Sequence, residues 1–183
     1  MFTLAISSLF LKFIPLLPSQ ILLANLISDV PLTTISTDNV DEDYLKKPKR
    51  WNIKMISKFM FFFGFISSIF DLITIGLLFF IVKAEPAMFR TAWFLESVLS
   101  EIIVTFSIRT KKAFWKSNPS KMLLYASIIS IILTVALIYS PLAFLFQFEK
   151  LTITLLLIIG GILFLYLVLV DVFKIRFFKK HED

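Results

Sequence analysis

Long apolar runs separated by short polar connections dominate the chain. The six apolar segments cover residues 1–17, 19–36, 59–82, 88–108, 122–140 and 151–173. Most of them reach the ~20 residues that a helix needs to cross the hydrocarbon core of a bilayer. The first segment is shorter, because a helix rises only ~1.5 Å per residue and about 25 Å falls short of a full crossing. The pattern predicts an all-α membrane protein, a helical bundle of five full spans and one partial span.

Composition supports the membrane class and excludes several kinds of chemistry. The chain is 58% hydrophobic and 17% charged, with a mean hydropathy of +0.88. It contains no cysteine, which excludes disulfides, thiolate metal sites and thiol nucleophiles. The single histidine, His181, excludes a zinc site built from several histidines. All four glycines lie in apolar segments, so we expect no glycine-rich phosphate loop and no nucleotide site in this chain.

The basic residues divide unequally between the two sides of the predicted bundle. Fifteen lie after the second segment, after the fourth segment and in the C-terminal tail, and three lie in the opposite connections. By the positive-inside rule, this bias places both termini and the 37–58 and 109–121 connections in the cytoplasm. The net charge of +6 does not indicate nucleic-acid binding, because the basic residues flank membrane segments. We therefore expect a multi-pass protein of the cell membrane whose helices contact the lipid bilayer.

The second segment contains polar side chains where an apolar helix is expected. Asn25 and Asp29 are four residues apart and share one helical face, with Ser28 beside them. Pro31 lacks an N–H and leaves the carbonyl of Ile27 without its helical partner. These oxygen atoms are hard ligands that suit Mg²⁺ or Ca²⁺, and a carboxylate at membrane depth is costly unless it has a function or a partner. Cation binding is therefore favoured over the alternative, an interhelical hydrogen-bond patch.

Three further carboxylates lie within apolar segments. Asp71 is interpreted as a second ligand, a proton acceptor or one half of a buried pair with Lys12. Glu96 and Glu101 are five residues apart, roughly 140° around a helix, so they do not form a paired-carboxylate catalytic site. We expect one of these two to line a cavity and the other to lie nearer the cytoplasmic surface. Four side chains are expected to face the interior of the bundle: Asn25, Asp29, Asp71 and Glu96.

Two other charged features are given structural interpretations. The acidic stretch 38–43 lacks the glycine and glutamate of an EF-hand loop, and it is interpreted as part of a cytoplasmic loop whose basic half meets anionic headgroups. Asp171, near the end of the last segment, is expected to extend toward Lys174.

Several motifs together resemble a known family. They are Phe-Ile-Pro-Leu-Leu-Pro (13–18), Gln-Ile-Leu-Leu-Ala-Asn-Leu-Ile-Ser-Asp (20–29), Asp-Asn-Val-Asp-Glu (38–42), Leu-Lys-Lys-Pro-Lys-Arg-Trp (45–51), Ser-Ser-Ile-Phe-Asp (67–71), Trp-Phe-Leu-Glu-Ser (93–97) and Ile-Arg-Thr (108–110). In this order, they resemble the C-terminal membrane domain of P-type cation-transporting ATPases, most closely the bacterial magnesium-transporting type. The resemblance covers almost the whole chain, 1–183, and implies that its segments match family helices five (second half only) to ten.

The resemblance also implies roles for individual residues. Asn25 and Asp29 match the sixth-helix residues that bind the transported cation, and Ser28 lies between them. Glu96 or Glu101 matches the eighth-helix region that can contribute a carboxylate. Such a pump hydrolyses ATP on a phosphorylated aspartate and moves Mg²⁺ into the cytoplasm. Magnesium as the ion follows from the resemblance alone, because oxygen ligands also suit calcium.

Other family parts are absent from the sequence. It has no Asp-Lys-Thr-Gly-Thr phosphorylation motif, no Thr-Gly-Glu actuator motif and no Gly-Asp-Gly hinge motif, and it contains no counterpart of the first four family helices. We therefore expect a fragment that does not hydrolyse ATP alone and that needs a partner chain with the catalytic domains and helices one to five. The alternatives are a non-catalytic structural or regulatory membrane protein and a non-functional fragment.

Overall fold

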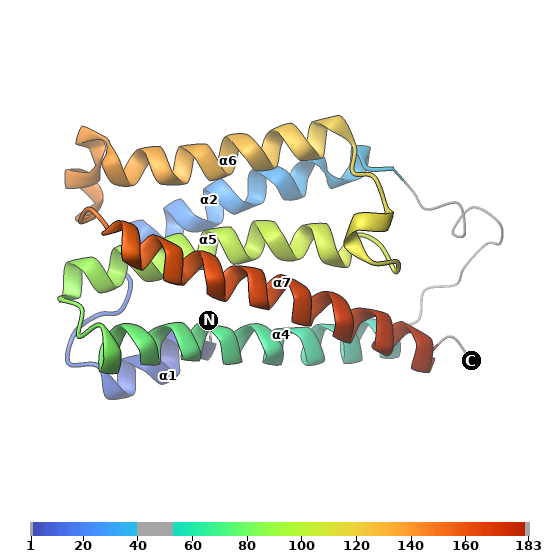
Figure 1. Ribbon diagram of the computed structural model, residues 1–183, viewed down its shortest axis with the longest axis horizontal. Coiled ribbons are helices and arrows are strands. Elements are labelled where there is room, and N and C mark those ends of the chain that lie inside the picture. Colours follow the sequence, from blue (N-terminus) through green and yellow to red (C-terminus); the bar gives the residue numbers. More distant parts are fainter. Residues whose placement is uncertain (1, 40–52, 182–183) are drawn as a thin grey trace.

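The computed structural model describes residues 2–39 and 53–181, and the regular structure within these ranges is helical. The α-helices are α1 (Phe2–Phe10), α2 (Pro18–Thr34), α4 (Ile53–Gly76), α5 (Pro86–Ile108), α6 (Lys121–Tyr139) and α7 (Ile153–His181). A π-helical turn, Leu77–Ile81, continues α4, and a 3₁₀ turn, Ile35–Thr37, continues α2. Figure 1 shows the long helices lying side by side along one axis, with their connections at the two ends. The predicted all-helical bundle is confirmed.

Within the described residues, four helices are long and apolar enough to cross a membrane: Ile53–Ile81, Pro86–Ile108, Lys121–Tyr139 and Ile153–Lys179. The chain is therefore a multi-pass membrane protein. Helices α4 and α7 run past the predicted apolar runs 59–82 and 151–173 into basic sequence, because long Lys and Arg side chains reach water while their backbone stays helical.

The two N-terminal helices are shorter. Helix α2 has 17 residues, and α1 has only nine, which at ~1.5 Å per residue is about 13 Å. Within the predicted segment 1–17, the helix ends at Phe10, and the chain turns before Pro18 begins α2. Proline suits this first helical position, because its missing N–H would have no helical partner there and its φ already fits a helix.

Helix α5 is the most buried of the long helices. In its apolar window 61% of residues are buried, against 28% in each of the other three. Its side chains Phe89, Phe94 and Val98 are fully buried, and the helix packs against α2, α4, α6 and α7. Functional side chains on α5 are therefore held at the centre of the bundle.

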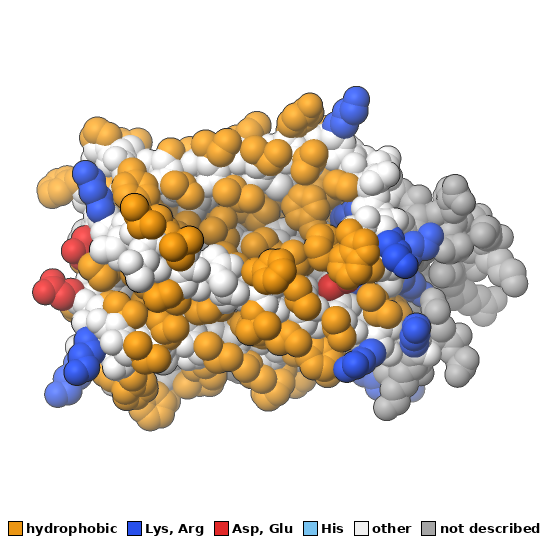
Figure 2. Space-filling view, viewed as in Figure 1, with side chains coloured by type: hydrophobic (Ala, Val, Ile, Leu, Met, Phe, Trp, Pro, Cys, Tyr) orange, Lys and Arg blue, Asp and Glu red, His pale blue; other side chains and the backbone are white. Residues whose placement is uncertain are grey.

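The outer surface is apolar along its length. Figure 2 shows hydrophobic side chains over the middle of one face and basic side chains toward both ends. Large side chains such as Phe61 and Phe164 are exposed, as expected for helices that face lipid. The bundle packs through bulky groups: Phe59, for example, lies with its ring 5.5 Å from that of Phe177 on α7.

A buried ion pair ties α7 to the end of α5. Asp171 and Lys174 are 1% and 0% exposed and form a salt bridge. Asp171 accepts hydrogen bonds from Ser107 Oγ at 3.1 Å and from the Phe114 backbone N–H at 3.1 Å, while Lys174 Nζ donates to the Lys112 carbonyl at 2.7 Å. The predicted pairing is confirmed, but Lys174 points into the protein rather than to water, because its Nζ donates hydrogen bonds to the backbone carbonyls of Ser107 in α5 and of Lys112 in the connection that follows.

Candidate functional site

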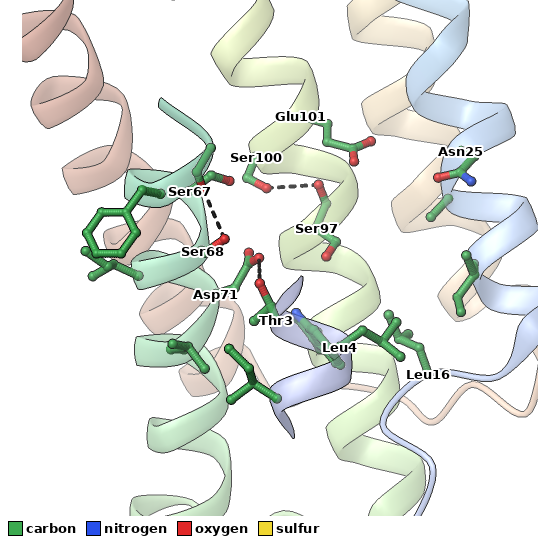
Figure 3. Close-up of a pocket in the computed structure, with 18 of the residues that line it drawn as sticks. Thr3, Leu4, Leu16, Asn25, Ser67, Ser68, Asp71, Ser97, Ser100 and Glu101 are labelled. Carbon is green, nitrogen blue, oxygen red and sulfur yellow. Dashed lines mark hydrogen bonds between the residues drawn. The ribbon is translucent and has the colours of Figure 1, made fainter. Parts of the chain in front are cut away.

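A cavity of about 760 Å³ lies between α1, α2, α4 and α5. Its polar lining consists of Thr3, Asn25, Ser67, Ser68, Asp71, Ser97, Ser100 and Glu101. Figure 3 shows these groups converging from the four helices. The remaining lining is apolar, and its members Phe61 and Phe65 on α4 are exposed, so the cavity opens to the surface between α2 and α4.

The Asp71 carboxylate is hydrogen-bonded to α1. Its Oδ2 accepts a hydrogen bond of 2.8 Å from Thr3 Oγ1, which is visible in Figure 3. Thr3 is 2% exposed, whereas Lys12 is exposed. The alternative that pairs Asp71 with Lys12 is therefore wrong. Lys12 follows the end of α1, where the chain has already turned toward Pro18.

Serine hydroxyls add neutral oxygen atoms to the lining. Ser68 Oγ donates to the carbonyl of Gly64 at 3.0 Å, and Ser100 Oγ donates to the carbonyl of Ser97 at 2.9 Å. Each hydroxyl proton is satisfied by its own helix, as is common for serine within helices. The oxygen lone pairs remain as acceptors, which is the form in which a hydroxyl can contact a cation.

The polar face of α2 is only partly enclosed. Ser28 is buried, and its Oγ donates to the carbonyl of Asn25 at 3.3 Å. Asn25 lines the cavity but is exposed, and Asp29 is exposed and lies outside the lining. The expectation that Asn25 and Asp29 face the interior is therefore wrong for the described residues. The physical reason is that their side of α2 borders the opening of the cavity, where no described helix covers them.

Glu96 and Glu101 have different surroundings, as their spacing predicts. Glu101 lines the cavity and lies opposite Ser28 and Asp29 of α2. Glu96 is 1% exposed, outside the lining, and its Oε2 has no hydrogen-bond partner in the described structure. The expectation of one cavity carboxylate is confirmed by Glu101. The second carboxylate, Glu96, was expected nearer the cytoplasmic surface. It is instead buried in the bundle and lies farther than Glu101 from the Ile108 end of α5, the end that the basic residues predict to be cytoplasmic.

The predicted site residues thus fall into two groups. Asn25, Asp71 and Glu101 share one cavity, with Ser28 and Asp29 beside it, and Glu96 is separate. Among residues 2–39 and 53–181, no three acidic or histidine side chains lie close enough to hold a metal by themselves. The arrangement offers dispersed carboxylate, amide and hydroxyl oxygens around an open space, which suits a cation that keeps part of its water.

Sequence reasoning missed several polar contacts. Thr3 has no sequence signal, because its partner Asp71 is 68 residues away. Ser97 had one: it precedes Glu101 by four residues and so shares its helical face. Asp38, assigned to a loop, instead pairs with Arg109 in a buried salt bridge of 2.8 Å. The rest of the acidic stretch, 40–43, and the motif at 45–51 lie outside the described residues.

Comparisons with known proteins agree with this architecture. The family model described as cation transporting ATPase, C-terminus, matches residues 13–176. The chain is 38% identical over 155 residues to the magnesium-transporting ATPase, P-type 1, of Escherichia coli K12, and 37% and 31% identical to two such proteins of Salmonella typhimurium LT2. Each match covers 82% of this chain and 17% of the relative, so the chain spans about a sixth of their length. The chain belongs to the family of cation-transporting ATPase C-terminal domains.

Proposed function

We propose that this chain forms part of the ion pathway of a magnesium-transporting P-type ATPase and does not hydrolyse ATP by itself. The observation that carries the proposal is the shared cavity of Asn25, Asp71 and Glu101, contributed by α2, α4 and α5. The relatives are named as magnesium-transporting ATPases. Mg²⁺ would be the transported ion, and the bilayer would surround the bundle.

The chemistry of the cavity fits Mg²⁺ as cargo. Mg²⁺ is octahedral, dehydrates reluctantly and is commonly bound through one or two carboxylates with several waters retained. Six waters at ~30 Å³ each occupy about 180 Å³. The cavity of about 760 Å³ therefore has room for a hydrated ion. Asp29 and Glu101, on adjacent helices, would supply the charge, and Asn25 and the serine hydroxyls would supply neutral acceptors.

The exposed part of α2 supports a partner polypeptide. An ionised side chain at membrane depth costs at least a few kcal/mol against lipid, and Asp29 and Asn25 are both exposed. We propose that membrane helices of the pump's remaining part cover this face and complete the site. The same partner would carry the ATP-hydrolysing domains. Both chains would act in the cell membrane, with the C-terminus of this one in the cytoplasm; the start of α1 lies part-way along the bundle, where Thr3 meets Asp71.

A structural or regulatory membrane role is the second candidate. It is favoured by the absence of a three-acid cluster among the described residues and by the use of Asp71 as an acceptor for Thr3. Under this alternative, the polar groups would hold the helices together through hydrogen bonds. Replacing a carboxylate with the amide of the same size would then leave ion transport by an assembled pump unchanged.

A complementation experiment separates the two candidates. The chain is co-expressed, in a bacterial strain deficient in magnesium uptake, with a truncated magnesium-transporting ATPase that lacks the region matched here. We expect growth at low Mg²⁺ only when both parts are present. Glu101→Gln should abolish this growth, whereas Glu85→Gln, an exposed control at the start of α5 and outside the cavity, should not. Assembly of the two parts without rescue would favour the structural role.

A further inference from the structure

The buried pair of Asp38 and Arg109 joins the end of α2 to the end of α5. Arg109 NH1 lies 2.8 Å from Asp38 Oδ2, and the side chains of Arg109 and Asp38 are 2% and 9% exposed. Asp38 follows the 3₁₀ turn that continues α2, and Arg109 is the C-cap residue of α5. A short, charge-assisted hydrogen bond between buried groups is strongly directional.

The same carboxylate also reaches α6. Asp38 Oδ1 accepts a hydrogen bond of 2.8 Å from the backbone N–H of Ser120, and Ser120 Oγ caps α6 by accepting from the N–H of Leu123 at 3.1 Å. The second guanidinium nitrogen of Arg109, NH2, donates to the carbonyl of Ser117. One carboxylate and one guanidinium therefore fix the ends of three helices relative to one another.

Asp38 and Arg109 are separated from the carboxylates of Asp29 and Glu101, respectively, by nearly equal lengths of chain. Asp38 follows Asp29 by nine residues, and Arg109 follows Glu101 by eight. At ~1.5 Å per residue, each helix extends roughly 12–14 Å from the pair to its carboxylate. A slip of α2 by one residue would move Asp29 about 1.5 Å along the axis and turn it about 100°. Ligand distances of ~2.0–2.1 Å around Mg²⁺ do not tolerate such a change.

The apolar contacts between α2 and α5 are less directional. Ala24 and Ile27 of α2 belong to the same apolar cluster as Val98 and Ile102 of α5. Apolar packing stabilises the contact between the helices but tolerates small axial shifts better than the charge-assisted hydrogen bond between Arg109 NH1 and Asp38 Oδ2 does. We propose that Asp38 and Arg109 are positioning residues that set the register of α2 against α5. This register in turn sets the separation of the Asp29 and Glu101 carboxylates. The link from this separation to Mg²⁺ transport rests on the proposed function.

Cysteine cross-linking measures this register directly, because the chain contains no cysteine. One reporter pair is Ser28→Cys with Glu101→Cys, and a second, one turn along α2, is Leu32→Cys with Glu101→Cys. Disulfide formation is followed in membranes containing the full chain. We expect faster cross-linking of the first pair, and Asp38→Asn should lower the ratio of the two rates by about threefold or more. Asparagine keeps an oxygen that can accept from Ser120, so this variant isolates the loss of the ion pair.

The control and the contrary outcomes are defined on the same reporters. Glu85→Gln, at the opposite end of α5, should leave the ratio unchanged. An unchanged ratio in Asp38→Asn overturns the proposal. If Asp38→Asn loses its helical circular dichroism, Arg109→Lys replaces it, because lysine keeps the charge but loses the planar fork. The ratio should again fall, and an unchanged ratio overturns the proposal.

A transport measurement adds a readout that a purely structural role would not move. In the complemented pump, Asp38→Asn should raise the KM for Mg²⁺ about threefold or more while changing kcat less. Equal KM values for the folded variant and the parent would overturn the link to the site. The cross-linking measurement does not depend on transport. If Asp38→Asn lowers the ratio of the two cross-linking rates but this chain never restores growth at low Mg²⁺, the positioning role stands and the proposed function fails.

Discussion

Thr3 of α1 and Asp71 of α4 are joined by a hydrogen bond of 2.8 Å, although 68 residues separate them. The bond attaches the shortest α-helix of the described structure to a helix long enough to cross the membrane. It also uses one oxygen of a carboxylate that lines the cavity. The geometry of Asp71 therefore depends on the placement of α1.

Thr3→Val should loosen α1, because valine has nearly the same shape but no hydroxyl donor. We expect a loss of about 1–3 kcal/mol, the range for a buried group left unsatisfied. Hydrogen exchange should show faster exchange in α1, while α6 is unchanged. Thr33→Val is the matched control, since Thr33 is exposed and donates only to the carbonyl of Val30 in its own helix. Equal exchange in both variants would contradict the importance of the bond.

Lys174→Met should strongly destabilise the bundle. The variant leaves the buried carboxylate of Asp171 without its cation, and breaking a buried pair on one side costs about 3–5 kcal/mol. Adding Asp171→Leu should recover part of this loss, because the uncompensated charge is then gone. Unfolding in a detergent titration measures both effects, with the exposed Lys58→Met as control. A double variant less stable than Lys174→Met would contradict this account.

Glu96→Gln is expected to leave the fold intact or to stabilise it by about 1–3 kcal/mol. The carboxyl Oε2 is buried without a hydrogen-bond partner in the described structure, so an amide of the same size gives up no hydrogen bond at this atom and removes the cost of ionising a buried acid. The thermal unfolding midpoint of the purified chain reports the change. A clear drop in that midpoint would show that the protein depends on the charge of Glu96.

The distribution of basic residues predicts which end of the bundle faces the cytoplasm. A single cysteine placed by Asn118→Cys, in the exposed connection between α5 and α6, should react with an impermeant thiol reagent only from the cytoplasmic side. Lys150→Cys, in the connection before α7, should react only from the outside. Each variant is the control for the other, and the reverse pattern would contradict the predicted orientation.

Local pattern was enough to predict the helices and part of the cavity. The long apolar runs contain the helices, and the polar side chains Asn25, Asp71 and Glu101 within those runs are the predicted residues that line the cavity. Sequence could not reveal that Asp38 meets Arg109, because 71 residues separate them and their pairing depends on how three helix ends pack. The exposure of Asp29 was equally hidden, since it depends on which helices stand beside α2.

Mg²⁺ flux tests the central claim most directly. Proteoliposomes containing this chain and the complementary part of a magnesium-transporting ATPase are loaded with a fluorescent Mg²⁺ indicator, and ATP-dependent flux is compared at equal protein content. Asp29→Asn preserves the size of the side chain and removes its charge. The account predicts that this variant loses flux by about tenfold or more, while Glu85→Gln keeps it. Undiminished flux in Asp29→Asn would contradict the assignment of α2 to the ion pathway.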